Sequence, residues 1–228
     1  MSLIVIFSDL RSLFGPVRNQ GPRPTCMAFA ASDAHAALRD GWVPLSCEYA
    51  FYQAQRRAKR PPSTGALLHS TLDALRHDGQ PEESGWPYLP ATPIDIATWI
   101  PSAMVGPLFG RAGTNLHLSI DQIITELNEG RPVIILTMLS PAFYNPSPDA
   151  VVHPANGEMP EPERRHAIIA TGHGMVDGHR AILIRNSWGP GWGAGGYAWL
   201  TEPFLSPRMF AAAMLMEEVD VSAHSDAA

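Results

Sequence analysis

The stretch that decides the fold is Asn-Ser-Trp-Gly-Pro-Gly-Trp-Gly at residues 186–193. It follows an apolar run at residues 181–184, which is typical of a β-strand. At the end of such a strand, the side-chain carbonyl of Asn186 can accept a hydrogen bond from a neighbouring strand. Trp188, two positions later, can shield that bond from water and so strengthen it.

A histidine opens another predicted strand, twenty residues before Asn186. The sequence there is His-Ala-Ile-Ile-Ala-Thr at residues 166–171. If His166 and Asn186 occupy neighbouring strands, the asparagine holds one imidazole nitrogen and the other can face a nucleophile. This combination of base and orienting group is the arrangement that activates a thiol or a hydroxyl.

The candidate nucleophile is Cys26, which follows a turn rich in glycine and proline and begins an alanine-rich run. A helix that starts here directs unpaired N–H groups and its dipole at the sulfur, which favours the thiolate. Gln20 lies six residues earlier and can return its side-chain N–H to the place where a carbonyl oxygen becomes negative. With the backbone N–H of Cys26, it would complete an oxyanion hole. Cys47, in contrast, is interpreted as a buried packing residue.

These stretches together resemble the papain-like cysteine peptidases, family C1 of clan CA, and are closest in style to bacterial members that lack a pro-segment. The order Cys, His, Asn agrees, and His166 follows Cys26 by 140 residues. Residues 186–193 match the family's third motif at every fixed position. Residues 83–88, Glu-Ser-Gly-Trp-Pro-Tyr, resemble the Glu-x-x-Trp-Pro-Tyr of bacterial members.

Two residues beside the nucleophile depart from the family pattern. Arg23 stands where many members have a disulfide-forming cysteine, which suits a reducing compartment. Pro24 replaces a glycine whose backbone lines the substrate pocket, so the substrate preference at that position does not carry over.

The resemblance implies a two-lobed α+β fold with the active cleft between the lobes. We expect one peptidase domain over residues 1–216, with a helical lobe at about 13–112. The rest of the domain is a β-barrel-like lobe at about 113–216, which also includes an N-terminal strap. An acidic tail follows at 217–228.

The local patterns agree with helices first and strands later. They predict a long surface loop without regular structure between residues 140 and 163, where prolines are frequent. The predicted helices cover about residues 26–39, 46–60 with Ser46 as N-cap, 66–77, and a fourth segment capped by Asp121. The predicted strands cover residues 132–138, 166–171, 181–184 and 197–200.

The function that this pattern implies is hydrolysis of peptide bonds through a thioester acyl-enzyme, by endo- or exopeptidase action. A transpeptidase or isopeptide-cleaving effector would use the same residues, and a non-catalytic peptide-binding protein could share the scaffold. Gly65 is interpreted either as a helix-entry turn or as a backbone site that pairs with an extended substrate. We place Trp188 at the substrate site as well.

Composition limits the partners and the location. The 228 residues carry a net charge of −6, are 45% hydrophobic and 17% charged, and form no large basic face. These values argue against a disordered chain and against nucleic acid as a partner. We expect no cofactor, no metal and no membrane contact; a peptide or protein is the expected substrate, and a separate protein inhibitor is an open partner.

The apolar run at residues 3–7 is much shorter than the core of a signal peptide, and two cysteines allow at most one disulfide. We therefore expect a cytoplasmic protein, with delivery into another cell left open.

Overall fold

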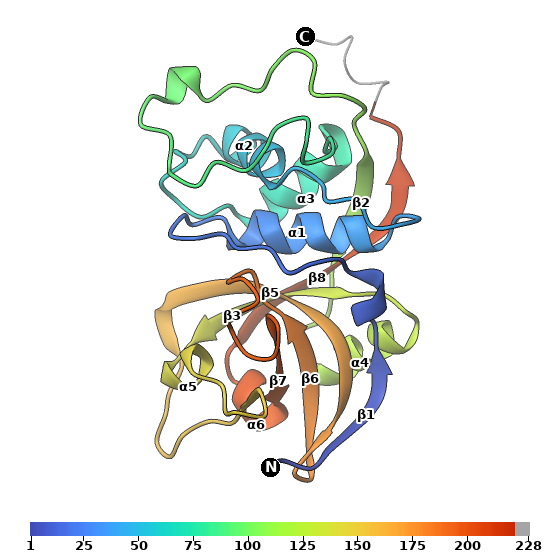
Figure 1. Ribbon diagram of the computed structural model, residues 1–228, viewed down its shortest axis with the longest axis vertical. Coiled ribbons are helices and arrows are strands. Elements are labelled where there is room, and N and C mark those ends of the chain that lie inside the picture. Colours follow the sequence, from blue (N-terminus) through green and yellow to red (C-terminus); the bar gives the residue numbers. More distant parts are fainter. Residues whose placement is uncertain (222–228) are drawn as a thin grey trace. The chain divides into compact units, whose positions relative to one another are not determined.

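Two structural units make up the chain, and each is built mainly from one kind of element. The structure is a computed structural model that describes residues 1–221. The β unit comprises Met1–Asn19 and Asn115–Met214, and the helical unit comprises Gln20–Thr114 and the segment from Leu215 onward. The elements of the β unit (Figure 1) are β1 (Ile4–Asp9), η1 (Arg11–Leu13), α4 (Ile120–Asn128), β3 (Val133–Leu139), α5 (Pro141–Tyr144), β4 (Val151–Val152), β5 (Glu161–Val176), β6 (His179–Arg185), β7 (Tyr197–Thr201), α6 (Glu202–Leu205) and the first part of β8 (Met209–Val219). Those of the helical unit are α1 (Cys26–Ala37), α2 (Cys47–Ala58), α3 (Leu68–His77), η2 (Ile96–Thr98) and β2 (Gly110–Asn115), whose last residue crosses the boundary.

The sheet of the β unit has the strand order β8-β3-β5-β6-β7-β4. Neighbours are antiparallel except for β4, which runs parallel to β7, and β1 pairs with the second half of β5. The long strand β5 therefore pairs with three others. Its first half, which contains His166, lies against β3, and its second half lies between β6 and β1.

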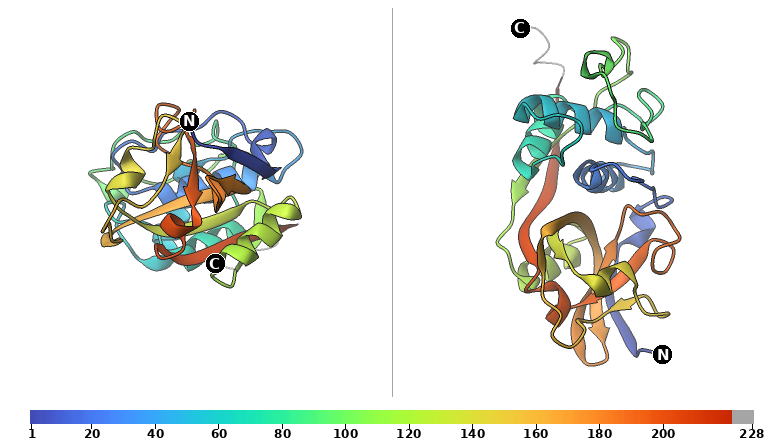
Figure 2. Two further views of the ribbon diagram at one scale, coloured as in Figure 1. Left: turned by 90° about the horizontal axis from the view of Figure 1, so that it is seen from below. Right: turned by 90° about the vertical axis from the view of Figure 1, so that its left-hand side faces the viewer.

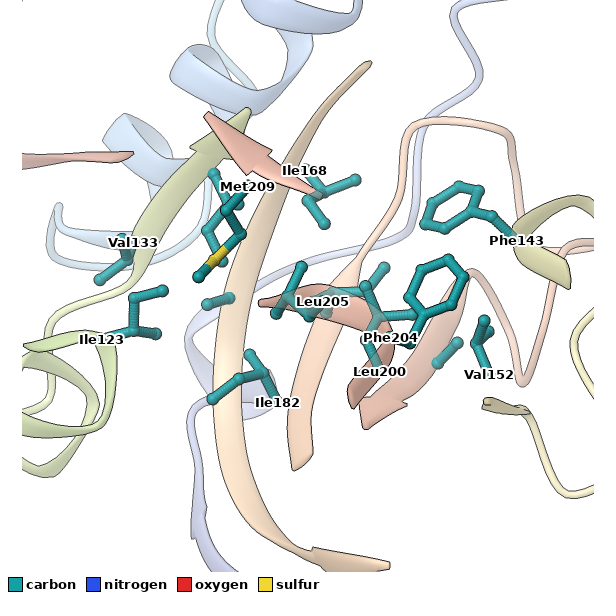
Figure 3. Close-up of a cluster of buried hydrophobic side chains, with 14 of the residues drawn as sticks. Ile123, Val133, Phe143, Val152, Ile168, Ile182, Leu200, Phe204, Leu205 and Met209 are labelled. Atoms are coloured by element: carbon teal, nitrogen blue, oxygen red, sulfur yellow. The ribbon is translucent and has the colours of Figure 1, made fainter. Parts of the chain in front are cut away.

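One face of this sheet is covered by α4, α6 and the turn of α5. Figure 3 shows the resulting core, in which Ile123 of α4 faces Val133 of β3, and Phe204 and Leu205 of α6 lie beside Leu200 of β7. These side chains are almost completely removed from water. The β-branched and apolar runs predicted as strands thus form the central strands, as their composition requires.

In the helical unit, α1 is buried on nearly every side, and α2 and α3 pack beside it (Figure 2, right, where α1 is seen end-on). Its many alanines allow this close approach. Ser46 is the N-cap of α2 as predicted, because its Oγ accepts from the Tyr49 N–H at 3.0 Å. The same hydroxyl donates to the Trp86 carbonyl at 2.6 Å.

Three sequence predictions were wrong in detail. The cap of α4 is Ser119 rather than Asp121, because Ser119 has the extended backbone that a cap needs and accepts from Gln122 N–H. The expected loop at residues 140–163 contains α5, β4 and the start of β5, since Pro141 occupies the first turn of a helix, where proline is tolerated. The acidic tail does not begin at Glu217, because β8 continues to Val219; residues 222–228 lie outside the described part.

The unit boundaries also differ from those expected at residues 13–19, which belong to the β unit. Arg185 explains this, because its guanidinium donates to the carbonyls of Gly15 and Pro16 at 2.9 and 2.7 Å. Asn19 forms a β-bridge with Trp188. No helix among residues 1–221 is long and apolar enough to cross a membrane.

The approach of β1 to β5 depends on a glycine at position 174. A Cβ at Gly174 would lie 2.2 Å from the carbonyl oxygen of Val5, which is backbone and cannot move independently of β1. We predict that Gly174→Ala lowers the free energy of unfolding by about 1–3 kcal/mol. Gly191→Ala is the matched control, because its new methyl would meet nothing within 4 Å. Equal stability of the two variants in urea denaturation would contradict the assignment of β1.

Candidate active site

His166 and Asn186 meet in the β unit. His166 lies within β5, and Asn186 follows the last residue of the neighbouring strand β6. His166 Nε2 donates to Asn186 Oδ1 at 2.7 Å, and the N–H of Ser187 donates to the same oxygen at 2.8 Å. Since that oxygen accepts both bonds, the proton of the neutral imidazole is on Nε2. The lone pair of Nδ1 is then the basic site of the ring.

Aromatic side chains cover this pair. The ring centroid of Trp188 lies 4.8 Å from that of His166, and the centroid of Phe143 lies 5.9 Å from it in an edge-on contact. Tyr144 stacks on Trp188 with 13° between the ring planes. Trp188 was expected here from the sequence. Phe143 and Tyr144 were missed because they lie in the segment that was expected to be an irregular loop.

Burial keeps the imidazole neutral. Only 5% of His166 is exposed, and this loss of solvation lowers its pKa to about 4, although the hydrogen bond with Asn186 acts in the opposite direction. At neutral pH the ring can therefore accept a proton on Nδ1. A negative charge facing the ring would raise the pKa again.

Cys26 is the first residue of α1 in the helical unit. Its side chain is partly exposed, whereas Cys47 is completely buried, and the two form no disulfide. The preceding Thr25 makes no side-chain cap to the helix, and its hydroxyl instead contacts the Tyr88 hydroxyl at 2.8 Å. The first-turn N–H groups of α1 therefore lie next to the sulfur without a capping side chain, which is the environment that favours a thiolate.

Gln20 begins the turn before Cys26, and Gly65 lies near the same turn. Gln20 is 7% exposed, and its Nε2 donates to the carbonyl of Arg23 at 2.8 Å, which orients its amide. A Cβ at Gly65 would lie 3.8 Å from the carbonyl of Pro24, so the backbone of Gly65 runs beside the turn. This position fits both interpretations of Gly65.

The predicted site residues are therefore divided between the two units. The β unit holds His166, Asn186 and Trp188, and the helical unit holds Gln20 and Cys26, with Gly65 beside the turn. Among residues 1–221 no group of three or more His, Cys, Asp or Glu side chains is placed to bind a metal ion.

The chain is similar to known cysteine proteases. Residues 109–204 match the family described as papain family cysteine protease. The chain is similar to the papain family over this segment. A cysteine protease of Blomia tropicalis is 25% identical over 200 residues, which are 81% of this chain and 56% of that protein. The chain spans about half the length of the curated relatives that it matches across most of its sequence.

Solved structures show the papain fold for nearly the whole chain. Xylellain, a cysteine protease from Xylella fastidiosa, aligns with a TM-score of 0.74 at 20% identity and covers 93% of this chain and 86% of its own. The Carica candamarcensis cysteine protease CMS1MS2, solved in complex with E-64, aligns with a TM-score of 0.70 at 21% identity over 95% of this chain and 98% of its own. The α+β fold class expected from the sequence is thereby confirmed.

The fold also explains the glycine and tryptophan residues of the motif at residues 186–193. Gly193 has φ +57°, and a Cβ there would lie 2.2 Å from the carbonyl of Tyr197. Trp192 donates its Nε1–H to the carbonyl of Phe143 at 3.1 Å, so the motif fixes the aromatic cover of His166.

The state of His166 can be measured directly. We predict that ¹⁵N NMR of the Cys26→Ala variant finds a neutral imidazole protonated on Nε2, with a pKa of about 4. In the wild type we expect a higher pKa, because a thiolate would stabilise the imidazolium. A titration near 6.5 in Cys26→Ala, or a proton on Nδ1, would show that the described burial and hydrogen bond are incorrect.

Proposed function

We propose that this chain is a cysteine peptidase of the papain family, which cleaves peptide bonds through a thioester acyl-enzyme. The observation that carries the proposal is the His166–Asn186 hydrogen bond, which leaves Nδ1 of a buried, shielded imidazole as the basic site. Cys26 at the N-terminus of α1 supplies the nucleophile that such a base serves.

The reaction proceeds in two halves. His166 takes the proton of Cys26, and the thiolate forms a bond to the carbonyl carbon of the substrate. The carbonyl oxygen becomes negative and accepts hydrogen bonds from the Cys26 backbone N–H and the Gln20 side chain. His166 then gives its proton to the leaving nitrogen as the C–N bond breaks, which leaves a thioester.

Water completes the cycle. His166 removes a proton from a water molecule, whose oxygen attacks the thioester carbon. The C–S bond breaks, the carboxylic acid leaves, and the thiolate and the protonated imidazole return. No other reactant is required. An amine in place of water would give the transpeptidase reaction, and the mass of the product distinguishes the two.

Two further residues are assigned to substrate binding in this proposal. The backbone of Gly65 beside the Pro24 carbonyl can pair with an extended substrate as an added strand. Trp188, which stacks on Tyr144 and also contacts the His166 ring, can contact the leaving side of the substrate. We also propose a reducing compartment such as the cytoplasm, where the thiolate of Cys26 persists.

Labelling with an epoxide peptide inhibitor tests the proposal. We predict that near neutral pH one equivalent modifies Cys26 and leaves Cys47 unmodified, because Cys26 is partly exposed, whereas Cys47, which also begins a helix, is completely buried. Peptide mapping by mass spectrometry identifies the modified site. Modification of Cys47 first, or of neither cysteine, would reject the peptidase and favour a peptide-binding protein on the same fold.

Substitutions in the β unit separate the base from the orienting group. We predict that His166→Ala removes turnover almost completely, whereas Asn186→Ala leaves a folded protein with a reduced kcat, because the imidazole keeps its chemistry but loses its fixed orientation. Steady-state cleavage of a fluorogenic peptide measures both, and circular dichroism checks folding. Near wild-type rates for both folded variants would contradict the assigned roles.

A further inference from the structure

Polar side chains that the catalytic scheme does not use bind the turn from Gln20 to Cys26 to the rest of the helical unit. Its centre is the carbonyl of Arg23, which accepts from Gln20 Nε2 at 2.8 Å and from the Thr25 N–H at 2.9 Å. The position of this one oxygen therefore sets the orientation of the Gln20 amide. The contacts that fix Arg23 therefore also fix Gln20, the proposed oxyanion donor.

Arg23 is held by a buried ion pair with Glu48 of α2. The guanidinium is 2% exposed, and its Nη1 and Nη2 lie 2.5 and 3.0 Å from the two carboxylate oxygens of Glu48. Nη1 also donates to the carbonyl of Leu89 at 2.6 Å. This two-point contact fixes the guanidinium in orientation as well as in position.

Glu48 is itself completely buried and saturated with donors. Besides Arg23, it accepts from the Trp99 indole N–H at 2.7 Å and from the Leu89 N–H at 3.1 Å. A buried charge is tolerated only when it is paired and hydrogen-bonded in this way. Loss of any one of these hydrogen bonds would leave a buried polar group unpaired, so the cluster around Glu48 is held in one arrangement. The turn before Cys26 is attached to this cluster through Arg23.

Tyr88 provides the second attachment. Its hydroxyl donates to the Gln20 carbonyl at 2.6 Å and contacts Thr25 Oγ1 at 2.8 Å, so one oxygen joins both ends of the turn. The guanidinium of Arg23 lies 4.9 Å from the Tyr88 ring centroid, and the Tyr88 N–H donates to Glu83 at 2.9 Å. The Glu-x-x-Trp-Pro-Tyr stretch thereby contacts the turn that carries the nucleophile.

We propose that Tyr88 and the Arg23–Glu48 pair are positioning residues, which hold Gln20 and the turn before Cys26 in the geometry that catalysis requires. This inference rests on the proposed peptidase function. Arg23, Glu48 and Tyr88 touch no reacting atom; they act through the Arg23 carbonyl and the two ends of the turn. Loss of this positioning should lower kcat more than it changes KM, because oxyanion stabilisation acts in the transition state.

Tyr88→Phe tests the proposal with the smallest change, since it removes only the hydroxyl. We expect kcat for a short fluorogenic peptide to fall about tenfold or more, with KM changed less than about twofold. In a Gln20→Ala background, where the positioned group is absent, the same change has little further effect on kcat. Arg23→Lys keeps the charge but loses the two-point contact, and follows the same pattern.

Tyr49→Phe is the matched control. It also removes a tyrosine hydroxyl in the helical unit, one bonded to Gln53 and not to the turn. We expect its kcat to remain near that of the wild type. Equal losses from Tyr88→Phe with and without Gln20, or equal losses from Tyr88→Phe and Tyr49→Phe, overturn the proposal.

A measurement without substrate separates this inference from the peptidase proposal. We expect the side-chain amide of Gln20 to have a high ¹⁵N order parameter in the wild type, and a clearly lower one in Tyr88→Phe but not in Tyr49→Phe. An unchanged order parameter in Tyr88→Phe rejects the positioning role whatever the activity. A wild type with an ordered Gln20 that cleaves no peptide would refute the proposed function alone.

Discussion

The chemistry of the β unit depends on one hydrogen bond, between His166 Nε2 and Asn186 Oδ1. Its geometry follows from the antiparallel pairing of β5 and β6, which brings two residues twenty positions apart to the same place. The bond selects the tautomer, and the selected tautomer directs the basic nitrogen away from Asn186. Burial beneath Trp188 and Phe143 then keeps the ring neutral. Without the asparagine, the same buried imidazole would have neither a fixed proton nor a fixed direction.

The proposed nucleophile, in the helical unit, depends on a different physical effect. The N-terminus of α1 offers Cys26 a favourable electrostatic environment without a capping side chain. The turn before it is rigid because the Arg23–Glu48 pair and the Tyr88 hydroxyl hold its carbonyls. Arg23 stands where the family resemblance puts a disulfide-forming cysteine. An ion pair in this place needs no oxidant, so the attachment persists under the reducing conditions that keep a thiol nucleophile active.

Sequence alone predicted the fold class and the identities of the residues in both halves of the candidate site. Cys26, His166 and Asn186 were identifiable because each lies in or directly beside a regular element with a strong local pattern. The supporting contacts were not identifiable in the same way. Arg23 and Glu48 are separated by 25 positions, and neither is marked by periodicity, so only tertiary packing shows that they pair. Glu83–Tyr88 was recognised as a motif, but its contact with the turn depends on how a loop returns to α1.

Local rules failed where two signals competed. Several prolines between residues 140 and 163 suggested an irregular loop, yet Pro141 begins a helical turn that carries Phe143 to His166. Ser119 and Asp121 are both good capping residues, and only the backbone conformation decides between them. The acidic residues after Met216 suggested a tail, but main-chain pairing extends β8 through Val219. In the same segment the Arg111 guanidinium donates to the Met216 carbonyl and contacts Glu218.

The central claim is that Cys26 and His166 titrate and react as a pair. The pH dependence of Cys26 alkylation by iodoacetamide, compared between the wild type and His166→Ala, tests it most directly. The account predicts that wild-type Cys26 reacts well below the usual thiol pKa of about 8.5, and that His166→Ala moves the reaction midpoint upward toward that value. Identical alkylation profiles for the two folded proteins would contradict it.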